Sequence, residues 1–343
     1  MTTSIRTIAR VAETSVSSVS RVLNNSGYVS LDVRQRVETA IKDLNYTPSK
    51  GARMLRGEAS RMVGLMLPSI DVPFFGILAN TIERELFERG YHTLICISAE
   101  NEDHEARYVA MLRAQRVEGV IVASAYGGTS HLQPLVESGI PIIAIDRQLI
   151  GISDDVFMAD HVEGGRLMTR HLVDLGHRHI AVVGAPGHSQ PIQLRLEGIR
   201  GILHECGLPP AVEAIGEDHS FAGTYALAQQ IQREHGEITA IIGTSDIAAI
   251  AAIHAVRDNG GRVPEDCSVI GFDDLPEASY VLPRLTTVAQ PIRDVALEAT
   301  RRLEERLLDR QQGLERRPAS LVRLPVHLVV RETTGAVPPA DPD

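Results

Sequence analysis

The chain of 343 residues has few cysteines and no long apolar run. Cys96, Cys206 and Cys267 are far apart, odd in number and outside any C-x-x-C spacing, so we expect buried structural thiols rather than disulfides or a metal site. No run of about eighteen apolar residues is long enough to span a membrane, and Met1–Ser4 do not lead into a secretory signal. We therefore expect a cytoplasmic protein without a membrane partner.

Signatures of common enzyme classes are also missing. The chain contains no glycine-rich phosphate loop and no G-x-S-x-G nucleophile elbow. It does contain two groups of reactive side chains, Asp273-Asp274 and His177-Arg178-His179. Adjacent residues on a strand point to opposite sides, so we expect packing and loop hydrogen bonds for both groups. The sequence thus predicts no enzyme activity, no catalytic residue, no cofactor and no metal.

The net charge of -10 by itself disfavours a nucleic-acid partner, but the charge is unevenly distributed. Residues 1–60 hold nine Arg and Lys residues against five Asp and Glu residues, a net charge of +4 that leaves -14 for the rest of the chain. A basic head on an acidic body directs polyanion affinity to one end of the chain.

A short amphipathic helix over Ser15–Asn24 indicates what the basic head contacts. At helical spacing its apolar residues share one face, while small hydroxyls and one arginine face outward. Small hydroxyls let a helix lie close to phosphates, and an arginine fork matches the acceptor pair of guanine. Taken alone, a serine-rich solvated face is the simpler interpretation. The apolar residues are Val16, Val19, Val22 and Leu23, and the outward ones are Ser17, Ser18, Arg21 and Asn24.

Neighbouring segments favour the nucleic-acid interpretation. Apolar spacing predicts a helix before this one, and another after it that Ser30 can cap. Three short helices within about 45 residues, the second presented outward, are typical of a helix-turn-helix headpiece. The first helix carries Ile8, Val11 and Ala12, and the third carries Val33, Val37, Ala40, Ile41 and Leu44.

From about Arg61, apolar runs of strand length alternate with amphipathic helical stretches. This alternation predicts parallel, doubly wound α/β subdomains, and the chain contains two such series. Open α/β sheets bind ligands at the carboxyl ends of their strands, so we expect a ligand between the two subdomains. The first series has strands near 62–67, 93–97, 119–123 and 140–145, and the second has strands near 156–159, 179–183, 240–242 and 268–271, followed by a helix at 292–308 and a strand at 326–330.

A linker joins the head to the body over Tyr46–Gly57. Ser49 can cap a helix of about two turns there and Gly57 can end it, but so short a helix is unstable alone in water. Gly51 weakens it by a further ~1 kcal/mol relative to Ala. A linker that folds only against a partner surface is a natural coupling element, and a plain flexible linker is the alternative.

Seven short motifs occur in an order and spacing similar to those of one known family. Together they resemble the lactose-repressor/galactose-repressor (LacI/GalR) family of bacterial transcription factors over nearly the whole chain. The motifs are Val19-Ser20-Arg21-Val22-Leu23-Asn24, Asn45-Tyr46-Thr47-Pro48, Pro73-Phe74-Phe75, Asp146-Arg147, Leu175-Gly176-His177-Arg178, Ile270-Gly271-Phe272-Asp273-Asp274 and Leu285-Thr286-Thr287-Val288.

The resemblance implies roles in DNA binding. Arg21 carries most of the base recognition, and Leu55 is an apolar wedge that kinks the duplex at a central base step. Two linkers meet at that step, so the resemblance implies a homodimer on pseudopalindromic operator DNA. The implied base-reading residues are Val16, Ser17 and Arg21, the phosphate contacts Ser15, Ser18, Ser20, Asn24 and Ser30, and the minor-groove residues Ala52 and Leu55.

The resemblance also implies a small-molecule effector between two periplasmic-binding-protein-like subdomains. Carboxylates, an arginine, an amide and an aromatic wall can satisfy the hydroxyls of a sugar and cover its apolar face. A nucleoside or a small acid fits the same groups, and we favour a sugar. The implied ligand-binding residues are Phe74, Phe75, Asp146, Arg195, His219, Asp246 and Gln290.

The sequence departs from the family pattern at three places. His219 stands where the family has an aromatic residue, and Ser245 stands where it has Asn. We interpret the connection at Glu13–Val16 as about three residues shorter than that of the family, because the Ala-Gly-Val-like turn that the family has between the first two helices is missing here. Two alternatives to a working repressor follow: a family member with impaired DNA binding, and a soluble sugar-binding protein.

We therefore predict a ligand-responsive regulator, most simply a repressor, in which the ligand either releases or promotes DNA binding. The expected fold is an all-α helix-turn-helix headpiece plus an α/β core of two doubly wound parallel-sheet subdomains. The predicted domains are the headpiece at 1–46, a hinge helix at 47–60, the effector-binding core at 61–334 and a disordered tail at 335–343, with one subdomain at about 61–155 and 290–318 and the other at about 156–289 and 319–334.

Overall fold

The computed structural model describes residues 4–23, 26–46, 59–123, 128–184, 186–217 and 220–337. The chain forms two compact units, Met1–Ser60 and Arg61–Asp343. Most of the hinge predicted at 47–60 and most of the tail predicted at 335–343 lie outside the described residues.

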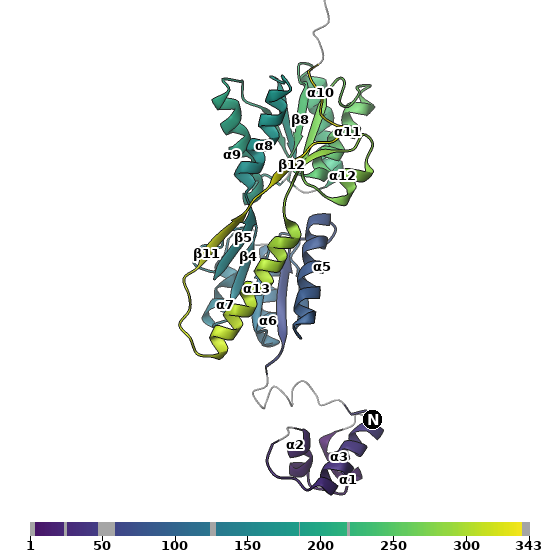
Figure 1. Cartoon of the computed structure of the whole chain (residues 1–343), viewed down its shortest axis with the longest axis vertical. Helices are drawn as coiled ribbons and strands as arrows, with labels where there is room; N and C mark the ends of the chain where they lie inside the picture. Colours follow the sequence, from purple (N-terminus) through teal and green to yellow (C-terminus); the bar gives the residue numbers. More distant parts are fainter. Residues whose placement is uncertain are drawn as a thin grey trace, which may run out of the picture. The chain divides into compact units, whose positions relative to one another are not determined.

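The first unit contains three helices around a small core (Figure 1): α1 (Ile5–Val11), α2 (Val16–Leu23) and α3 (Leu31–Asp43). Side-chain oxygens cap all three, because Ser4, Ser15 and Ser30 each accept a hydrogen bond from a backbone N–H three residues on. The cap predicted for Ser30 is therefore confirmed. The core consists of Ile8, Ala9, Ala12, Val19, Val22, Val37 and Ala40.

The turn between α1 and α2 has its full length, so the predicted shortening was wrong. Four residues, Ala12 to Ser15, separate the two helices. The apolar spacing predicts Ala12 within the first helix, but it lies after the helix end as its C-cap. Glu13 adopts a φ of 48°, a left-handed conformation that usually favours glycine. Ala12, Glu13 and Thr14 therefore form the turn that was thought to be missing.

The first sheet of the second unit has the strand order β11-β5-β4-β3-β1-β2, with every pairing parallel. Helices α5 (Pro73–Glu88) and α13 (Ile292–Gln311) pack on one face, and α6 (Glu102–Ala114), the 3-10 turn Ser130–Leu132 and α7 (Gln133–Glu137) pack on the other. The strands are β1 (Met62–Leu67), β2 (His92–Ile97), β3 (Gly119–Val122), β4 (Ile142–Ile145), β5 (Asp155–Ala159) and β11 (Ser320–Leu324).

The second sheet repeats this plan with the order β12-β10-β9-β8-β6-β7, antiparallel only between β10 and β12. Helices α8 (His161–Asp174) and α9 (Gln190–Glu205) cover one face, and α10 (Phe221–Glu234) and α11 (Asp246–Asp258) cover the other. The remaining elements are β6 (Ile180–Gly184), β7 (Val212–Ile215), β8 (Ala240–Gly243), β9 (Ser268–Asp273), α12 (Pro276–Tyr280), β10 (Thr286–Ala289) and β12 (His327–Val329).

Helices α8 and α9 approach each other so closely that two positions exclude any side chain (Figure 1). A Cβ atom on Gly165 would lie 2.1 Å from the carbonyl oxygen of Arg195, and one on Gly198 would lie 2.0 Å from that of Val162. Backbone therefore packs directly on backbone, which fixes the position of α9 and of the side chains that it carries.

The chain crosses between the two subdomains three times: from β5 to α8, from β10 to α13 and from β11 to β12. The predicted subdomain boundaries misplaced two strands. We assigned 156–289 and 319–334 to the second subdomain, but β5 pairs with β4, and β11 pairs with β5. Both strands therefore belong to the first sheet, because an isolated apolar run does not reveal which neighbour it pairs with.

Candidate functional site

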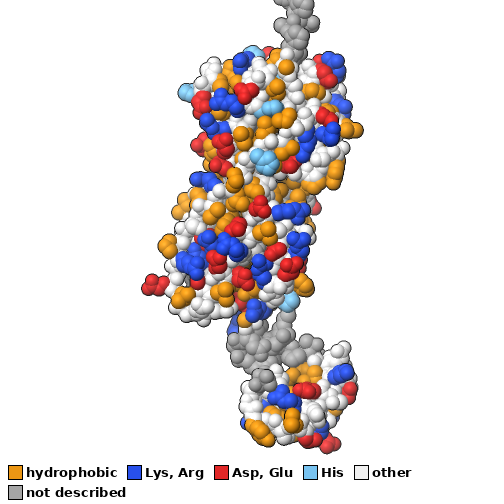
Figure 2. Space-filling view, in the orientation of Figure 1, with side chains coloured by type: hydrophobic (Ala, Val, Ile, Leu, Met, Phe, Trp, Pro, Cys, Tyr) orange, Lys and Arg blue, Asp and Glu red, His pale blue; other side chains and the backbone are white. Residues whose placement is uncertain are grey.

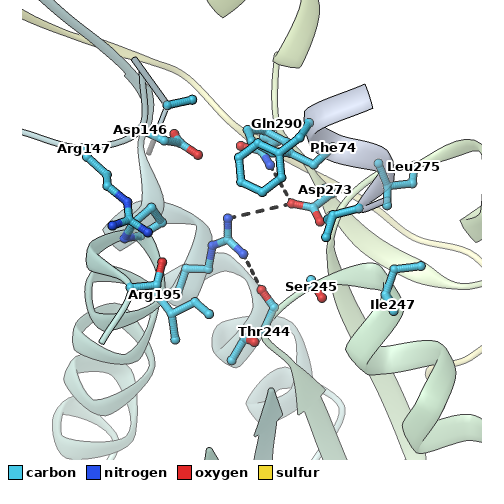
Figure 3. Close-up of a pocket in the computed structure, with 16 residues that line it drawn as sticks. Phe74, Asp146, Arg147, Arg195, Thr244, Ser245, Ile247, Asp273, Leu275 and Gln290 are labelled. Carbon is cyan, nitrogen blue, oxygen red and sulfur yellow. Dashed lines mark hydrogen bonds and ion pairs between the residues drawn. The ribbon is translucent and has the colours of Figure 1, made fainter. Parts of the chain in front are cut away.

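A cavity of about 60 Å³ lies between the two subdomains, where the strands of both sheets end at their carboxyl ends (Figure 3). The strand ends contribute its polar groups, and the amino-terminal turns of α5 and α9 close it from the sides. This is the position at which open α/β sheets bind ligands. The lining residues are Val72, Phe74, Phe75, Ala123, Asp146, Arg147, Ser189, Pro191, Ile192, Arg195, Thr244, Ser245, Ile247, Asp273, Leu275 and Gln290.

Two aromatic rings form the apolar wall. Pro73 occupies the first turn of α5, where its missing N–H costs nothing, and Phe74 and Phe75 follow it. Their rings pack edge to face, with centroids 5.0 Å apart and an interplanar angle of 76°. Both residues are buried at 8% exposure, and the ring of Phe74 stands over the polar groups in Figure 3. This wall suits a ligand with one flat apolar face.

Asp146, His161 and Arg195 form a buried chain of hydrogen bonds beside the cavity. The Nε of Arg195 donates to Nδ1 of His161 at 3.3 Å, so Nε2 of His161 carries the proton and donates to Oδ1 of Asp146 at 2.9 Å. Burial and the neighbouring guanidinium lower the pKa of His161, which keeps its ring neutral. Burial acts to raise the pKa of Asp146, but the contacts with His161 and Arg195 outweigh it and lower the pKa. Asp146 therefore stays an ionised acceptor.

The guanidinium of Arg195 is held in place by groups from the second sheet. It donates to the carbonyl oxygen of Thr244, and its other terminal nitrogen lies 3.8 Å from Oδ1 of Asp273. The ring of Phe272 lies beneath it, with Cζ of Arg195 3.6 Å from the ring centroid. These contacts fix the orientation of the fork at the floor of the cavity (Figure 3).

Asp273 and Gln290 complete the polar surface. The amide nitrogen of Gln290 donates to Oδ1 of Asp273 at 2.5 Å. Burial raises the pKa of Asp273 well above its ordinary range. Asp273 and Asp146 both adopt positive φ angles, 129° and 62°, which are uncommon for residues other than glycine. Backbone strain of this kind occurs at ligand-binding positions.

The structure brings together five of the seven predicted ligand-binding residues: Phe74, Phe75, Asp146, Arg195 and Gln290 all line the cavity. Asp246 does not, so its prediction as a direct ligand contact was wrong. Its carboxylate is fully buried behind the cavity wall, where it accepts hydrogen bonds from Oγ1 of Thr287 at 2.5 Å and the N–H of Leu275 at 2.7 Å. His219 lies outside the described residues.

Sequence reasoning missed Asp273, Arg147 and Ser189 as cavity residues. The sequence favours packing for Asp273, because adjacent residues on a strand point to opposite sides, so Asp273 and Asp274 do not converge on one atom. The side chains do separate as predicted: Asp274 pairs with Arg331 outside the cavity, while Asp273 faces inward. The available signal was the position of Asp273 at the carboxyl end of β9.

The outward face of α2 has the exposure that a DNA-reading helix requires. Val16, Ser17 and Arg21 are exposed, while Val19 and Val22 are buried in the headpiece core. Ser15 caps the helix, and its hydroxyl also lies 2.7 Å from that of Ser17 and 2.9 Å from that of Ser18. Asn24, Ala52 and Leu55, also predicted to contact DNA, lie outside the described residues.

No cluster of three or more His, Cys, Asp or Glu side chains within the described ranges has a geometry that would hold a metal ion. In the same part of the chain, no helix combines the length and apolar character needed to cross a membrane. His177, the buried member of the histidine group, is surrounded by structural partners: Thr239, Ser268 and the carbonyl of Gly335.

Comparisons with known proteins cover nearly the whole chain. Residues 4–49 match the family model for bacterial regulatory proteins of the lacI family, and residues 169–334 match that for a periplasmic binding protein-like domain. The ribose operon repressor of Halalkalibacterium halodurans is 35% identical over 334 residues, 97% of each chain.

Two solved structures are similar to this one. The lac repressor dimer bound to operator and an anti-inducer aligns with a TM-score of 0.82 at 30% identity, covering 98% of this chain and 100% of that one. A regulator from Enterococcus faecium with bound ribose aligns with a TM-score of 0.72 at 28% identity, covering 80% of this chain and 99% of that one.

Proposed function

We propose that this chain is a repressor controlled by a sugar that binds in the cavity between its subdomains. The chain belongs to the lacI family of bacterial regulatory proteins and is a DNA-binding transcriptional regulator. The observation that carries the proposal is the cavity itself. It combines two carboxylates, a fixed guanidinium and an amide with a wall of two phenylalanine rings. A ribose-binding neighbour and a ribose operon repressor among the relatives favour a sugar over a nucleoside or a small acid.

The cavity groups match the chemistry of a sugar ring. Asp146 and Asp273 accept hydrogen bonds from hydroxyl groups, while Arg195 and Gln290 donate to hydroxyl or ring oxygens. Phe74 covers the apolar face of the ring, which leaves the hydroxyls directed at the strand ends. The groups on opposite sides of the cavity come from different subdomains, so one ligand contacts both.

The size of the cavity favours a single sugar ring. A water molecule needs about 10–15 Å³ of such volume, so 60 Å³ holds about four to six water-sized groups, and even a single sugar ring requires the subdomains to open slightly. A disaccharide requires about twice the space of a monosaccharide and enters only if the subdomains open further. We therefore propose a monosaccharide or a close derivative as the effector.

The headpiece supplies DNA recognition in this proposal. Arg21 reads guanine through its fork, Val16 and Ser17 contact neighbouring base edges, and the serine hydroxyls of the helix contact phosphates. Because the lac repressor neighbour binds its operator as a dimer, we propose a homodimer on a pseudopalindromic site in the cytoplasm. Ligand binding shifts the population of subdomain arrangements, and thereby the operator affinity.

The relatives are transcriptional repressors, and we propose no catalytic step for this chain. Asp274 pairs with Arg331, and His177 lies within hydrogen-bonding distance of Thr239, so both have structural partners. Asp273 accepts a hydrogen bond from Gln290 at the cavity, where we propose that it contacts the ligand.

Calorimetric titration of the full chain with ribose, other monosaccharides, a disaccharide and a nucleoside tests the ligand class. The decisive variant is Asp273→Ala, which removes both carboxyl oxygens from the cavity surface. We expect at least about tenfold weaker binding of the effector, since leaving a buried hydrogen-bonding partner unsatisfied costs ~1–3 kcal/mol. Asp274→Ala is the matched control, because Asp274 pairs with Arg331 outside the cavity. Equal binding by both variants would place the ligand elsewhere.

A further inference from the structure

A second cavity, of about 240 Å³, lies in the first subdomain, at the opposite end of the sheet from the ligand cavity. It is located where β4 and β5 begin and where α13 ends, so it shares no residue with the first cavity. The lining residues are Gly139, Ile140, Pro141, Asp154, Arg306, Asp309, Arg310, Gly313, Leu314, Arg316 and Arg317.

Arg306 builds the wall of this cavity and is fully engaged in doing so. Its guanidinium is buried, with Nε 2.8 Å from Oδ2 of Asp155, and its terminal nitrogens donate to the carbonyls of Arg317 at 2.8 Å and Pro318 at 3.0 Å. One side chain therefore ties the segment after α13 to the start of β5. The cavity is thus part of a fixed framework.

Two other arginines at the cavity keep free donors. Arg310 donates from one terminal nitrogen to the carbonyl of Glu118 at 3.3 Å, and Arg316 uses its Nε on Asp154 at 2.5 Å. Among the described residues, the other N–H groups of these two guanidinium forks have no protein partner. Guanidinium forks bind oxyanions by paired hydrogen bonds, so these free donors point to an anionic ligand.

The charges around the cavity are nearly balanced. Four arginines and two aspartates line it, and Arg306 is paired in addition with Asp155 behind the wall. Helices α7 and α13 end beside it, and each carboxyl end contributes about -0.5 of a charge. Selection of an anion therefore rests on the free guanidinium donors and not on net charge. Figure 2 shows basic and acidic side chains interleaved over the face of this subdomain.

An apolar surface accompanies the cations. Ile140 and Pro141 form part of the buried wall, and Leu314 is 55% exposed at the cavity. An inorganic ion would leave Leu314 uncovered, whereas a ring or short chain bearing an oxyanion would bury it.

We propose that this cavity is a second ligand site, for a small organic anion that carries a carboxylate or phosphate group on an apolar body. The anion binds Arg310 and Arg316, and its apolar part covers Leu314.

The site is connected to the segment that leads to the headpiece. Arg310 donates to the carbonyl of Glu118, whose carboxylate accepts a hydrogen bond from the N–H of Arg61 at 2.6 Å. Arg61 is the first residue of the larger unit. The second site therefore lies one hydrogen-bonded residue away from the start of the larger unit.

Calorimetric titration of the full chain with phenyl phosphate and with benzoate tests the proposal, with benzyl alcohol as the neutral analogue. We expect one or both anions to bind, benzyl alcohol to bind at least about tenfold more weakly, and Arg310→Gln/Arg316→Gln to lose a similar factor. Arg301→Gln is the matched control, because Arg301 lies on the same helix but pairs with Glu298 and Glu305. Thermal unfolding verifies that each variant folds.

Three results would overturn the site. They are absence of binding by both anions, unchanged affinity in the double variant, and equal affinity for benzyl alcohol. Phe74→Ala distinguishes binding in the first cavity from binding in the second, because Phe74 lines only the first. Anion binding that survives Phe74→Ala supports the second site, and binding that disappears with it assigns the anion to the sugar cavity.

Discussion

Asp246 supports the ligand cavity without facing it. Its two carboxylate oxygens accept hydrogen bonds from Thr287 in β10 and from Leu275 in the segment after β9, so one buried side chain joins α11 to two other elements. Gly271 lies against it, since a Cβ there would approach Oδ1 of Asp246 to 2.5 Å. The sequence places Asp246 at a strand end but does not show that its side chain turns away from the ligand.

Asp246→Asn tests the electrostatic cost of this arrangement. Burial raises the pKa of Asp246 from 3.8 to about 7, so the folded state binds a proton more tightly than the unfolded state. The resulting stabilisation is fully present below pH 3.8 and is lost as the pH rises through about 7. We expect the free energy of unfolding of Asp246→Asn, measured in urea, to depend less on pH across this range.

The substitution is sterically tolerable, because an Asn side chain accepts from Leu275 and donates to the Thr287 hydroxyl. Asp266→Asn is the control, since its exposed carboxylate has a pKa lowered to about 2 by hydrogen bonds from Arg262. An Asp246→Asn variant with the same pH profile as the unmodified chain would contradict the buried-proton interpretation.

At the level of elements, most helices and strands follow from the apolar pattern alone. The run Met62–Leu67 is a strand with the predicted bounds, and α13 begins at the predicted residue 292 but continues three residues beyond the predicted end. Strands β7, β10 and β11 were missed. Strands β7 and β11 are half exposed and include polar residues, and β10 has four residues of which two are Thr, so none of them is a continuous apolar run. The turn at Glu13 was misjudged because apolar spacing assigned Ala12 to the first helix, whereas Ala12 is the C-cap of that helix.

Gly198→Ala tests the close contact between α8 and α9. The added methyl group would meet the carbonyl of Val162, so the helices must separate at a cost of ~1–3 kcal/mol or more. Because α9 carries Arg195, we expect weaker effector binding together with the lower stability. Urea unfolding and calorimetric titration measure the two effects.

Gly201→Ala on the same helix is the matched control. A Cβ there lies 3.5 Å from a terminal nitrogen of the flexible Arg166, and replacing a helical glycine stabilises by ~0.5–1 kcal/mol. The two substitutions should therefore change stability in opposite directions. Equal effects would show that the helix contact is more adaptable than its geometry indicates.

At the level of the whole molecule, the sequence predicted two kinds of unit but not all of their connections. The headpiece, the two sheets and the cavity between them are as the periodicity and the family resemblance indicate. The sequence did not show that β5 and β11 belong to the first subdomain, because strand pairing depends on tertiary contacts that no local pattern records.

Leu55→Ala tests the proposed coupling between effector and operator. Leu55 lies outside the described residues, and its assignment as a wedge between base steps comes from the family resemblance. We expect Leu55→Ala to weaken specific DNA binding and to reduce bending of the duplex, while effector binding by the isolated protein is unchanged. DNA binding titrations at stated salt and a bending assay measure the change, and normal affinity with normal bending would refute the wedge.

The three crossings between subdomains also determine where the gene tolerates interruption. Neither half of the core is continuous in the sequence, so a frameshift or stop codon before β11 removes an edge strand from each of the two sheets, although all cavity-lining residues are translated by residue 290. Late truncations should therefore behave as complete losses of the protein. Fusion partners belong at the ends of the chain, and the core must be exchanged between regulators as one piece from Arg61 onward.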